Sequence, residues 1–462
     1  MKFFKAPAKN AVEQHARMTC GPVGPLIVSL ALPTIASMLV TTIYNTADTY
    51  FVSQLGTSAS GAVGVVFSLM SIFQAAGFTL GMGAASVIAR MLGAGDARAA
   101  SEYGSTSFFS AMFTGAVICA AGLFFLDPLM RLLGSTPTIL PYARDYARWI
   151  LLGAPVICSS LSMNNILRSE GKAAFAMCGL VSGGVLNMAL DPIFIFAFGW
   201  GISGAAAATL LSQCVSFSIL FSFFARGKSV IKLSPKNISR RAAVFFSILR
   251  LGCPSLSRQG LAAVGTAALN TAAGGWGDAA VAAMSIVGRT FALILSVMIG
   301  LGQGFQPVAG YNFGARNYRR VRDALWFTVK TGMAMMAVLS AVCWFFAPDI
   351  IAFFRGEDAM VIAIGTRAMR WQAAALLLQP LFVATNMAHQ STGMAGRATF
   401  LACTRQGIYF LPLITLLPAI FGLTGVEATQ PISDVLSFAT SIPFLYYFLK
   451  MLKQKELEKT AM

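Results

Sequence analysis

The chain has 462 residues, of which 56% are hydrophobic and 11% are charged, and its formal net charge is +17 at pH 7. An average soluble domain has about 25% charged residues, so this composition excludes an ordinary soluble protein. Apolar stretches close to the roughly 20 residues that cross a bilayer recur along the chain and predict an integral membrane protein.

These apolar stretches predict twelve transmembrane helices. In chain order, the helices are expected near residues 25–53, 60–89, 106–126, 143–167, 174–198, 202–225, 244–272, 279–304, 327–347, 364–390, 399–421 and 430–450. Prolines interrupt many of them, which membrane helices tolerate when neighbouring helices satisfy the freed backbone groups. The expected fold class is therefore an all-α polytopic membrane protein built as a packed, kinked bundle.

The basic residues fall mainly in loops that would share one side of the membrane. With the N-terminus inside, most Lys and Arg residues become cytoplasmic, as the positive-inside rule requires. Only six fall near outer loops, namely Arg131, Arg144, Arg148, Arg355, Arg367 and Arg370. We therefore expect a multi-pass protein of the inner (plasma) membrane with both termini in the cytoplasm.

The N-terminal residues, the cysteines and histidines and the distribution of charge do not predict a signal peptide, a metal site or a nucleic-acid partner. Lys2, Lys5 and Lys9 are not followed by a short apolar core with a cleavage site, so no removable signal peptide is expected. The eight cysteines and two histidines have no metal-ligand spacing, so no metal site is expected. Because the positive charge follows membrane topology, nucleic acid is not expected as a partner.

An internal duplication is indicated by a shift of 221 positions. The shift pairs Pro33 with Pro254, Gly81 with Gly302, Gly83 with Gly304, Gly93 with Gly314 and Gly201 with Gly422. This predicts two six-helix lobes, residues 1–225 and 244–462, joined by a solvated, basic, cytoplasmic linker at 226–243. Since six is even, both lobes enter the membrane in the same orientation, related by a pseudo-twofold axis along the membrane normal.

Asp48 is a candidate for ion chemistry, because an ionised carboxylate in the bilayer costs a few kcal/mol and normally faces a cavity. It lies 15 residues after Pro33, roughly 22 Å along a helix. Tyr44, four residues earlier, shares its helix face and could donate a hydrogen bond to it. The alternative is a solvated Asp48 that caps a broken helix end.

Asp191 is the second candidate. Asn187, four residues earlier, would meet it on one face of a helix. Pro192 disfavours helical geometry at Asp191 and frees the carbonyl of Met188, so a carboxylate, an amide and a carbonyl would converge. Such oxygen atoms suit a hard cation or a shared proton. The alternative is that Asp191 begins a solvated loop.

Two further carboxylates, Glu427 and Asp434, fall at the start of the predicted twelfth helix. We expect them to be solvated or capping groups near the outer surface. Asp48 and Asp191 lie at similar predicted depth on different helices of one lobe, so we expect them to share a single site.

Several ordered motifs are spread along the chain. They are Leu32-Pro33, Thr42-Ile43-Tyr44-Asn45-Thr46-Ala47-Asp48, Gly81-Met82-Gly83, Asn187-Met188-Ala189-Leu190-Asp191-Pro192, Leu251-Gly252-Cys253-Pro254 and Gln306-Pro307-Val308-Ala309-Gly310-Tyr311. Their order and spacing resemble the multidrug and toxic compound extrusion (MATE) family over nearly the whole chain. The resemblance implies drug efflux by proton or sodium antiport through two six-helix lobes.

The pattern looks most like the branch of that family whose coupling site lies in the N-terminal lobe. The predicted seventh helix has Arg258 and Gln259, and the tenth has Gln379, His389 and Gln390, with no acidic residue in either membrane interior. Thr209 matches the family's hydroxyl partner. The cation-coupling residues implied are Tyr44, Asp48, Asn187, Asp191 and Thr209.

The remaining site residues are polar groups and prolines within predicted helices. Asn45, Asn164, Asn386, Gln390 and Arg258 are candidates for lining the substrate cavity, and a shift of 222 pairs Asn164 with Asn386. Pro33 and Pro192 are candidate hinges.

The predicted function is secondary active antiport. The protein would export cationic or amphipathic small molecules in exchange for H⁺ or Na⁺, as a monomer in the lipid bilayer and without a cofactor. It is not expected to be an enzyme, because no group of polar catalytic residues gathers at one membrane face. The alternatives are a flippase for a lipid-linked precursor or a channel.

Overall fold

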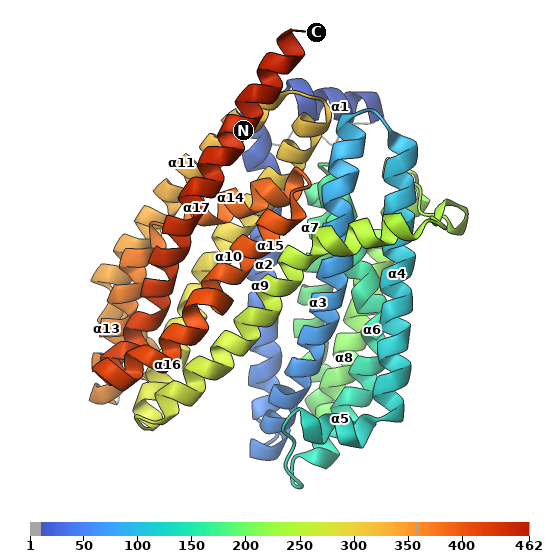
Figure 1. The fold of residues 1–462 in the computed structure, drawn as a ribbon. Coiled ribbons are helices and arrows are strands. Elements are labelled where there is room, and N and C mark those ends of the chain that lie inside the picture. The colour runs from blue at the N-terminus through green and yellow to red at the C-terminus, as the bar shows by residue number, and fades with distance from the viewer. Residues whose placement is uncertain (1–10, 356–357, 462) are drawn as a thin grey trace. The chain divides into compact units, whose positions relative to one another are not determined.

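The computed structural model describes residues 11–355 and 358–461, which form helices joined by turns and short loops, without a strand in either range (Figure 1). The predicted all-α membrane fold is confirmed. The N-terminal residues Lys2, Lys5 and Lys9, which entered the topology argument, lie outside the described residues.

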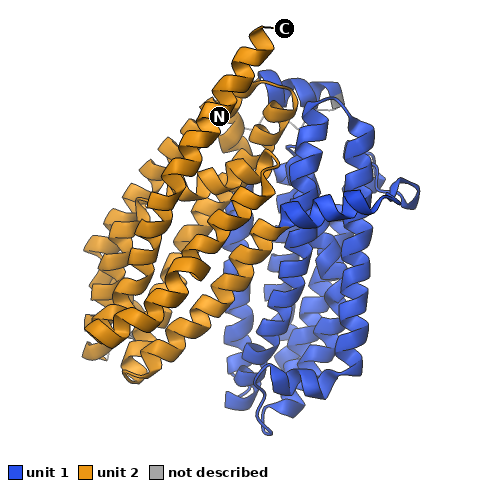
Figure 2. Ribbon diagram, in the orientation of Figure 1, with its two compact units in different colours: residues 1–20, 32–252 blue, residues 21–31, 253–462 orange. Residues whose placement is uncertain are grey.

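The chain divides into two compact units (Figure 2). Unit 1 comprises residues 1–20 and 32–252, and unit 2 comprises residues 21–31 and 253–462. Two long helices, α2 (Val23–Ser53) and α9 (Ala242–Gly274), contain the unit boundaries near their Pro33 and Pro254. The lobe limits at residues 225 and 244 stay a prediction, since these units are defined by packing.

The remaining helices belong to one unit each. Unit 1 contains α1 (Ala11–Cys20), α3 (Thr57–Gly93), α4 (Ala97–Phe124), α5 (Leu126–Leu132), α6 (Leu140–Ser169), α7 (Ala173–Pro192), the π-helix η1 (Ile193–Ala197), α8 (Gly201–Ala225) and the short 3₁₀-helix η2 (Pro235–Asn237). Unit 2 contains α10 (Asp278–Gly314), α11 (Tyr318–Phe345), α12 (Ala347–Arg355), α13 (Ala359–Leu376), α14 (Gln379–Ser391), α15 (Ala395–Cys403), the π-helix η3 (Thr404–Tyr409), α16 (Phe410–Phe421) and α17 (Leu423–Thr460).

Ten helices in the described ranges are long and apolar enough to cross a membrane. The other two predicted spans correspond to α9 and to a broken helix, since the segment predicted at 364–390 forms α13 and α14. The break coincides with Pro380, which lies in the first turn of α14. Proline has no backbone N–H to donate, and in the first turn of a helix that N–H would have no partner within the helix.

Glycines allow the close helix contacts that the repeated pattern anticipated. A Cβ atom at Gly83 would lie 2.0 Å from the carbonyl oxygen of Ile248, within unit 1. A Cβ atom at Gly304, its partner under the 221 shift, would lie 2.6 Å from the backbone nitrogen of Ala31, within unit 2. Small residues at such crossings let membrane helices approach at backbone distance.

The basic linker is docked on unit 1 around a buried carboxylate. Glu170 is fully buried and accepts hydrogen bonds from the Ser229 hydroxyl and from the backbone N–H groups of Val230, at 2.9 Å, and Ile231, at 3.2 Å. It also forms an ion pair of 3.0 Å with Lys172, which donates to the carbonyl of Lys228 at 2.7 Å.

Further along the linker, serine hydroxyls of α4 hold the backbone. Ser101 accepts from the Lys232 N–H at 3.2 Å, and Ser105 donates to the Lys232 carbonyl at 3.1 Å. Ile231 is 1% exposed. The prediction of a solvated linker is therefore wrong for this part: its backbone groups are bonded to α4 and to the turn after α6.

Candidate functional site

The first half of the candidate site joins α2 to α6. The Tyr146 hydroxyl, on a side chain that is 1% exposed, donates a hydrogen bond of 3.3 Å to Oδ2 of Asp48. The other carboxylate oxygen of Asp48 is buried and has no hydrogen-bond partner in the described part of the chain. Tyr146 was not anticipated from the sequence, and it takes the role expected of Tyr44.

Tyr44 lies nearby on α2 but faces α7. Its side chain is buried, and its ring would be 2.9 Å from a Cβ atom at Gly184, so the glycine makes room for it. The bulky ring therefore packs α2 against α7 one turn before Asp48.

The second half of the site joins α7 to α8. The Asn187 amide nitrogen donates to Oδ1 of Asp191 at 3.0 Å and to the Thr209 hydroxyl at 3.2 Å. All three side chains are buried, and Asp191 is fully so. The i, i+4 contact of Asn187 with Asp191 and the proximity of Thr209 are as predicted.

Pro192 does not act as predicted on the backbone of Asp191. The helix α7 continues through Asp191 to Pro192, and the irregular segment is the π-helix η1 that follows. Proline lacks the N–H that the carbonyl of Met188 would accept, but its φ of −63° is compatible with a helix. Asp191 is thus presented from helical backbone. Pro33 likewise lies within the continuous helix α2.

The two halves form one cluster inside unit 1. Asp48 and Asp191 are close enough to interact electrostatically, and the Tyr146 hydroxyl, which is bonded to Asp48, also lies near Thr209 and within electrostatic range of Asp191. Neither carboxylate pairs with a Lys or Arg side chain in the described ranges. Three buried oxygens, Asp48 Oδ1, Asp191 Oδ2 and Asn187 Oδ1, have no donor within the same ranges.

Acceptor oxygens without donors indicate the chemistry that the cluster can support. Each such oxygen is shielded from solvent and has no hydrogen-bond donor among the described residues, an arrangement that is costly until a partner is supplied. A proton or a hard cation would supply the missing partner, because carboxylate and amide oxygens are the ligands that such ions prefer.

The candidate cavity residues are largely engaged in bonds between helices. Asn164 donates to the carbonyl of Ala176 at 2.9 Å, and its repeat partner Asn386 donates to the carbonyl of Ala398 at 2.6 Å. Both asparagines are buried and brace a helix pair in the same way. The 222-residue shift thus recurs as a repeated hydrogen bond.

Gln390 and Arg258 lie together in unit 2. Gln390 is buried, accepts from the amide of Gln306 at 3.1 Å and donates to the Ser255 hydroxyl at 3.1 Å. The half-buried Arg258 makes two long contacts of 3.5 Å, with Asn386 and Ser255. Asn45 is half-buried on α2 in unit 1. Their roles in a substrate cavity stay predictions.

The two other membrane carboxylates are in unit 2 and are neutralised by arginines. Glu427 accepts two hydrogen bonds from Arg367, at 2.5 and 2.7 Å. Asp434 accepts from Arg405 at 2.7 Å. Each carboxylate residue is 1% exposed, so the prediction that they are solvated is wrong.

Asp434 has two further donors. Gln372 donates to its Oδ2 at 2.7 Å, and Gln430 donates to its Oδ1 at 2.9 Å. Arg405 reaches the carboxylate from η3, whose widened turn shifts the side chains of one helix face. Both oxygens of Asp434 are thereby satisfied, unlike those of Asp191.

Comparison with known proteins gives consistent matches over nearly the whole chain. The family model MatE matches residues 33–193 and again residues 254–414. The chain is similar to the multidrug export protein MepA of Staphylococcus saprophyticus, with 25% identity over 91% of this chain and 93% of the relative. It is 27% identical to MepA of Staphylococcus haemolyticus, over 92% of this chain and 93% of the relative.

The solved structures that match this chain belong to the same family as these relatives. A MATE in complex with MaL6 has a TM-score of 0.90 at 28% identity, covering 95% of this chain and 99% of that one. The outward-facing conformation of a multidrug resistance MATE family transporter of the MOP superfamily has a TM-score of 0.90 at 28% identity, covering 97% of this chain and 100% of that one. The two segments matched by the family model are offset by 221 residues, so the predicted duplication is confirmed.

Proposed function

The chain belongs to the MatE family of multidrug export proteins, and on this premise we propose that it is an antiporter whose coupling site is the Asp48–Asp191 cluster. It is a multi-pass membrane protein that exports drug-like molecules, and it is not an enzyme. The proposal adds that an inward-moving H⁺ or Na⁺ binds in unit 1, which would assign the chain to the branch with an N-terminal-lobe site.

The observation that carries this proposal is the set of buried acceptor oxygens on Asp48, Asp191 and Asn187 that have no donor among residues 11–355 and 358–461. Two carboxylates that interact in a poorly solvated place resist double ionisation. A cation that enters between them removes this repulsion and satisfies the free oxygens. The empty site is thus costly, and the cation-bound site is stable.

Coupling follows if the two conformations of the transporter differ in how tightly they hold the cation. A ligand shifts an equilibrium only by its difference in affinity for the two states. We propose that a bound cation favours a different bend of α2 near Pro33, with η1 after Pro192 as the second deformable segment. That bend would expel the substrate from the lobe.

The substrate class and arrangement in the membrane complete the proposal. Exported compounds would be cationic or amphipathic, and Asn45, Asn164, Asn386, Gln390 and Arg258 would tune which of them are accepted. Both termini would face the cytoplasm of a plasma-membrane monomer, in accordance with the positive-inside rule.

Transport by purified protein in liposomes tests the coupling site. A proton or sodium gradient is imposed in turn, and accumulation of a fluorescent cationic dye is measured for the wild type, Asp48→Asn and Asp191→Asn. Both variants should lose uphill export but keep counterflow of dye between equal concentrations, because the near-isosteric amides preserve the fold. Asp127→Asn, at a partly exposed surface ion pair, is the matched control. Uphill transport by both site variants at the wild-type rate would refute the assignment.

A further inference from the structure

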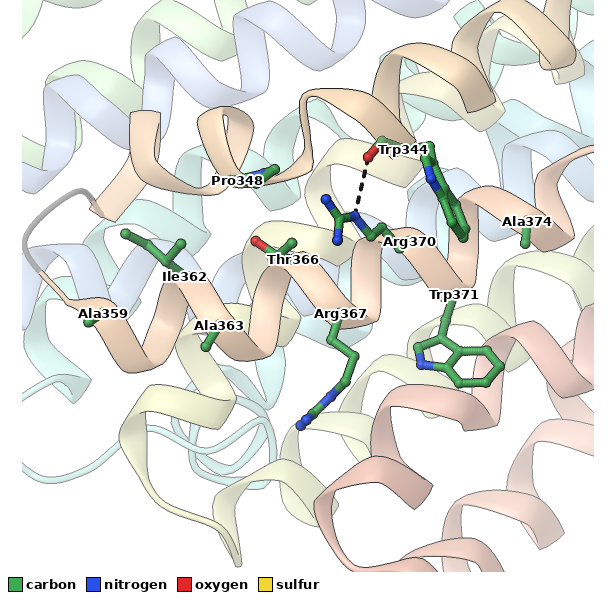
Figure 3. Close-up of a pocket in the computed structure, with 10 residues that line it drawn as sticks. All are labelled: Trp344, Pro348, Ala359, Ile362, Ala363, Thr366, Arg367, Arg370, Trp371 and Ala374. Atoms are coloured by element: carbon green, nitrogen blue, oxygen red, sulfur yellow. Dashed lines mark hydrogen bonds between the residues drawn. The ribbon is translucent and has the colours of Figure 1, made fainter.

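A groove of about 760 Å³ lies on unit 2, where α11 ends, α12 begins and α13 runs past them (Figure 3). Its walls are largely apolar and include Trp344, Pro348, Ile362 and Ala363. It shares no residue with the coupling cluster, whose members are all in unit 1. Nothing in the proposed transport mechanism uses it.

The groove's surroundings are those of a membrane boundary. Trp344 and Trp371 are 44% and 49% exposed, and neighbouring aromatic residues are more so, with Phe345 at 74% and Phe353 at 85%. Tryptophans gather where the acyl chains of a bilayer meet the headgroups. Trp344 and Phe345 lie at the end of α11, Phe353 lies near the end of α12, and Trp371 follows Arg370, whose Nε is bonded to the carbonyl of Trp344. The groove therefore opens toward lipid at headgroup depth.

Two arginines lie on successive turns of α13, and only one is neutralised. The Nε and Nη2 groups of Arg367 are both bonded to the buried Glu427. Arg370 donates from Nε to the carbonyl of Trp344 at 3.3 Å and has no acidic partner among the described residues. One positive charge is thus left over beside an apolar groove.

Figure 3 shows that this charge points into the groove. The Arg370 guanidinium extends from α13 toward the end of α11, on the same side as Thr366 and Pro348, whereas Arg367 and Trp371 extend from the other side of α13. The Thr366 hydroxyl, one turn before Arg370, is buried and has no hydrogen-bond partner in the described ranges. The charged N–H donors of Arg370 and the Thr366 hydroxyl therefore lie on the same side of α13, in the groove.

We propose that this groove binds an anionic phospholipid, with its phosphate on Arg370 and one acyl chain along the α13 wall past Ala363. An arginine forms its strongest hydrogen bonds with phosphate oxygens, and its terminal nitrogens are available here. The alkyl chain fits the apolar walls. A lipid with net negative charge is preferred over a zwitterionic one because Arg370 has no acidic partner among the described residues.

Lipid retention by the full chain tests the proposal. The protein is purified into detergent with equal amounts of phosphatidylglycerol and phosphatidylcholine of the same chain length, and lipid adducts are counted by native mass spectrometry. Wild-type protein should retain one phosphatidylglycerol that resists displacement. Arg370→Gln should reduce this retention at least fivefold, whereas Arg148→Gln, which removes an exposed arginine outside the groove, should leave it unchanged.

A second variant separates headgroup binding from occupation of the groove. Ala363→Phe keeps Arg370 but fills the exposed space beside α13, so it should also lower retention of phosphatidylglycerol. Retention at the wild-type level in Arg370→Gln, or in Ala363→Phe, would overturn the proposal, as would equal retention of both lipids by the wild type. None of these outcomes depends on whether Asp48 and Asp191 couple transport.

Discussion

Both units hold two carboxylates in apolar helices, but in the described ranges only those of unit 2 are paired with arginines. Asp434 and Glu427 each bind an arginine, and Asp434 has two glutamine donors in addition. Asp48 and Asp191 receive one neutral donor each and retain buried oxygens that have no partner in the described part of the chain. Asp191 is as deeply buried as Glu427 and Asp434, so a cationic partner, rather than the depth of burial, distinguishes them from it.

The duplicated fold did not impose this difference. Under the 221 shift Asp48 falls on Leu269 and Asp191 falls on Pro412, so neither carboxylate has a repeat partner. The shared pattern of Gly83 with Gly304 and Asn164 with Asn386 preserves packing in both halves. The two units therefore share packing residues but differ in the positions of their carboxylates and in the residues that bind them.

The largest effect should come from breaking a neutralised pair. Arg405→Leu leaves Asp434 buried without its cation, and removing one partner of a buried pair costs about 3–5 kcal/mol of unfolding free energy. Arg144→Leu, at a surface pair with both side chains over 40% exposed, should cost about 1 kcal/mol or less. Denaturant unfolding in micelles measures both.

A double variant sharpens this prediction. Combining Arg405→Leu with Asp434→Leu removes both charges and should recover much of the lost stability, because the desolvation cost disappears with the ions. If Arg405→Leu lost no more unfolding free energy than Arg144→Leu, the buried Asp434 would not depend on its arginine more than the surface Asp127 does.

The second effect concerns the carboxylates without basic partners. A cation that binds only the folded state stabilises it, by about 2.7 kcal/mol at one hundred times its dissociation constant. Asp191→Asn should abolish this increment, while Asp434→Asn should retain it on a lower baseline. Stability is measured against sodium at constant ionic strength and, separately, against proton concentration. An increment that vanishes only in Asp434→Asn would reverse the comparison.

A smaller effect is expected at the single hydrogen bond to Asp48. Tyr146→Phe removes the donor to Oδ2 and leaves the packing of the ring intact. A hydrogen bond to a charged group contributes about 1.5–3 kcal/mol. The loss in the cation-bound state should be smaller, because the bound cation also interacts with the Asp48 carboxylate. The cation concentration that gives half-maximal export should therefore change several-fold, without loss of coupling. Tyr44→Phe should change it less, since Tyr146 rather than Tyr44 donates to Asp48.

The smallest effect on coupling should come from the amides of unit 2. Asn386→Ala and Gln390→Ala remove neutral side chains that bond other protein groups, so they should change which compounds are exported and not the number of cations per molecule. Ratios of dye to ion flux in liposomes measure this. A variant that binds substrate but loses coupling would place the ion site in unit 2.

The sequence predicted contacts within one helix better than contacts between helices. Asn187 and Asp191 were placed together by their spacing alone, and they lie 3.0 Å apart at the bonded atoms. Tyr146 is 98 residues from Asp48 on another helix, and no periodic pattern marks it. The pair of Arg405 with Asp434 also joins two elements and has no periodic pattern in the sequence. For this reason the sequence predicted a solvated carboxylate where the structure has a buried ion pair.

The linker shows the same principle. Its basic composition predicted a solvated loop, but Glu170 and the α4 hydroxyls bind its backbone, and backbone groups are not distinguishable by residue type. Glycine and proline positions were more informative. Their constant offset of 221 residues predicted the duplication. Helix limits, predicted from apolar stretches, were less accurate, since α10 extends to Gly314 and α17 to Thr460.

The exchange of helix ends between the units has a consequence for a chain of half the length. Residues 21–31, from the N-terminal half, belong to unit 2, and the start of α9, from the C-terminal half, belongs to unit 1. Neither half of the sequence therefore encodes a complete unit. A half-length chain produced alone would therefore lack one segment of its unit and would need a second copy to supply it.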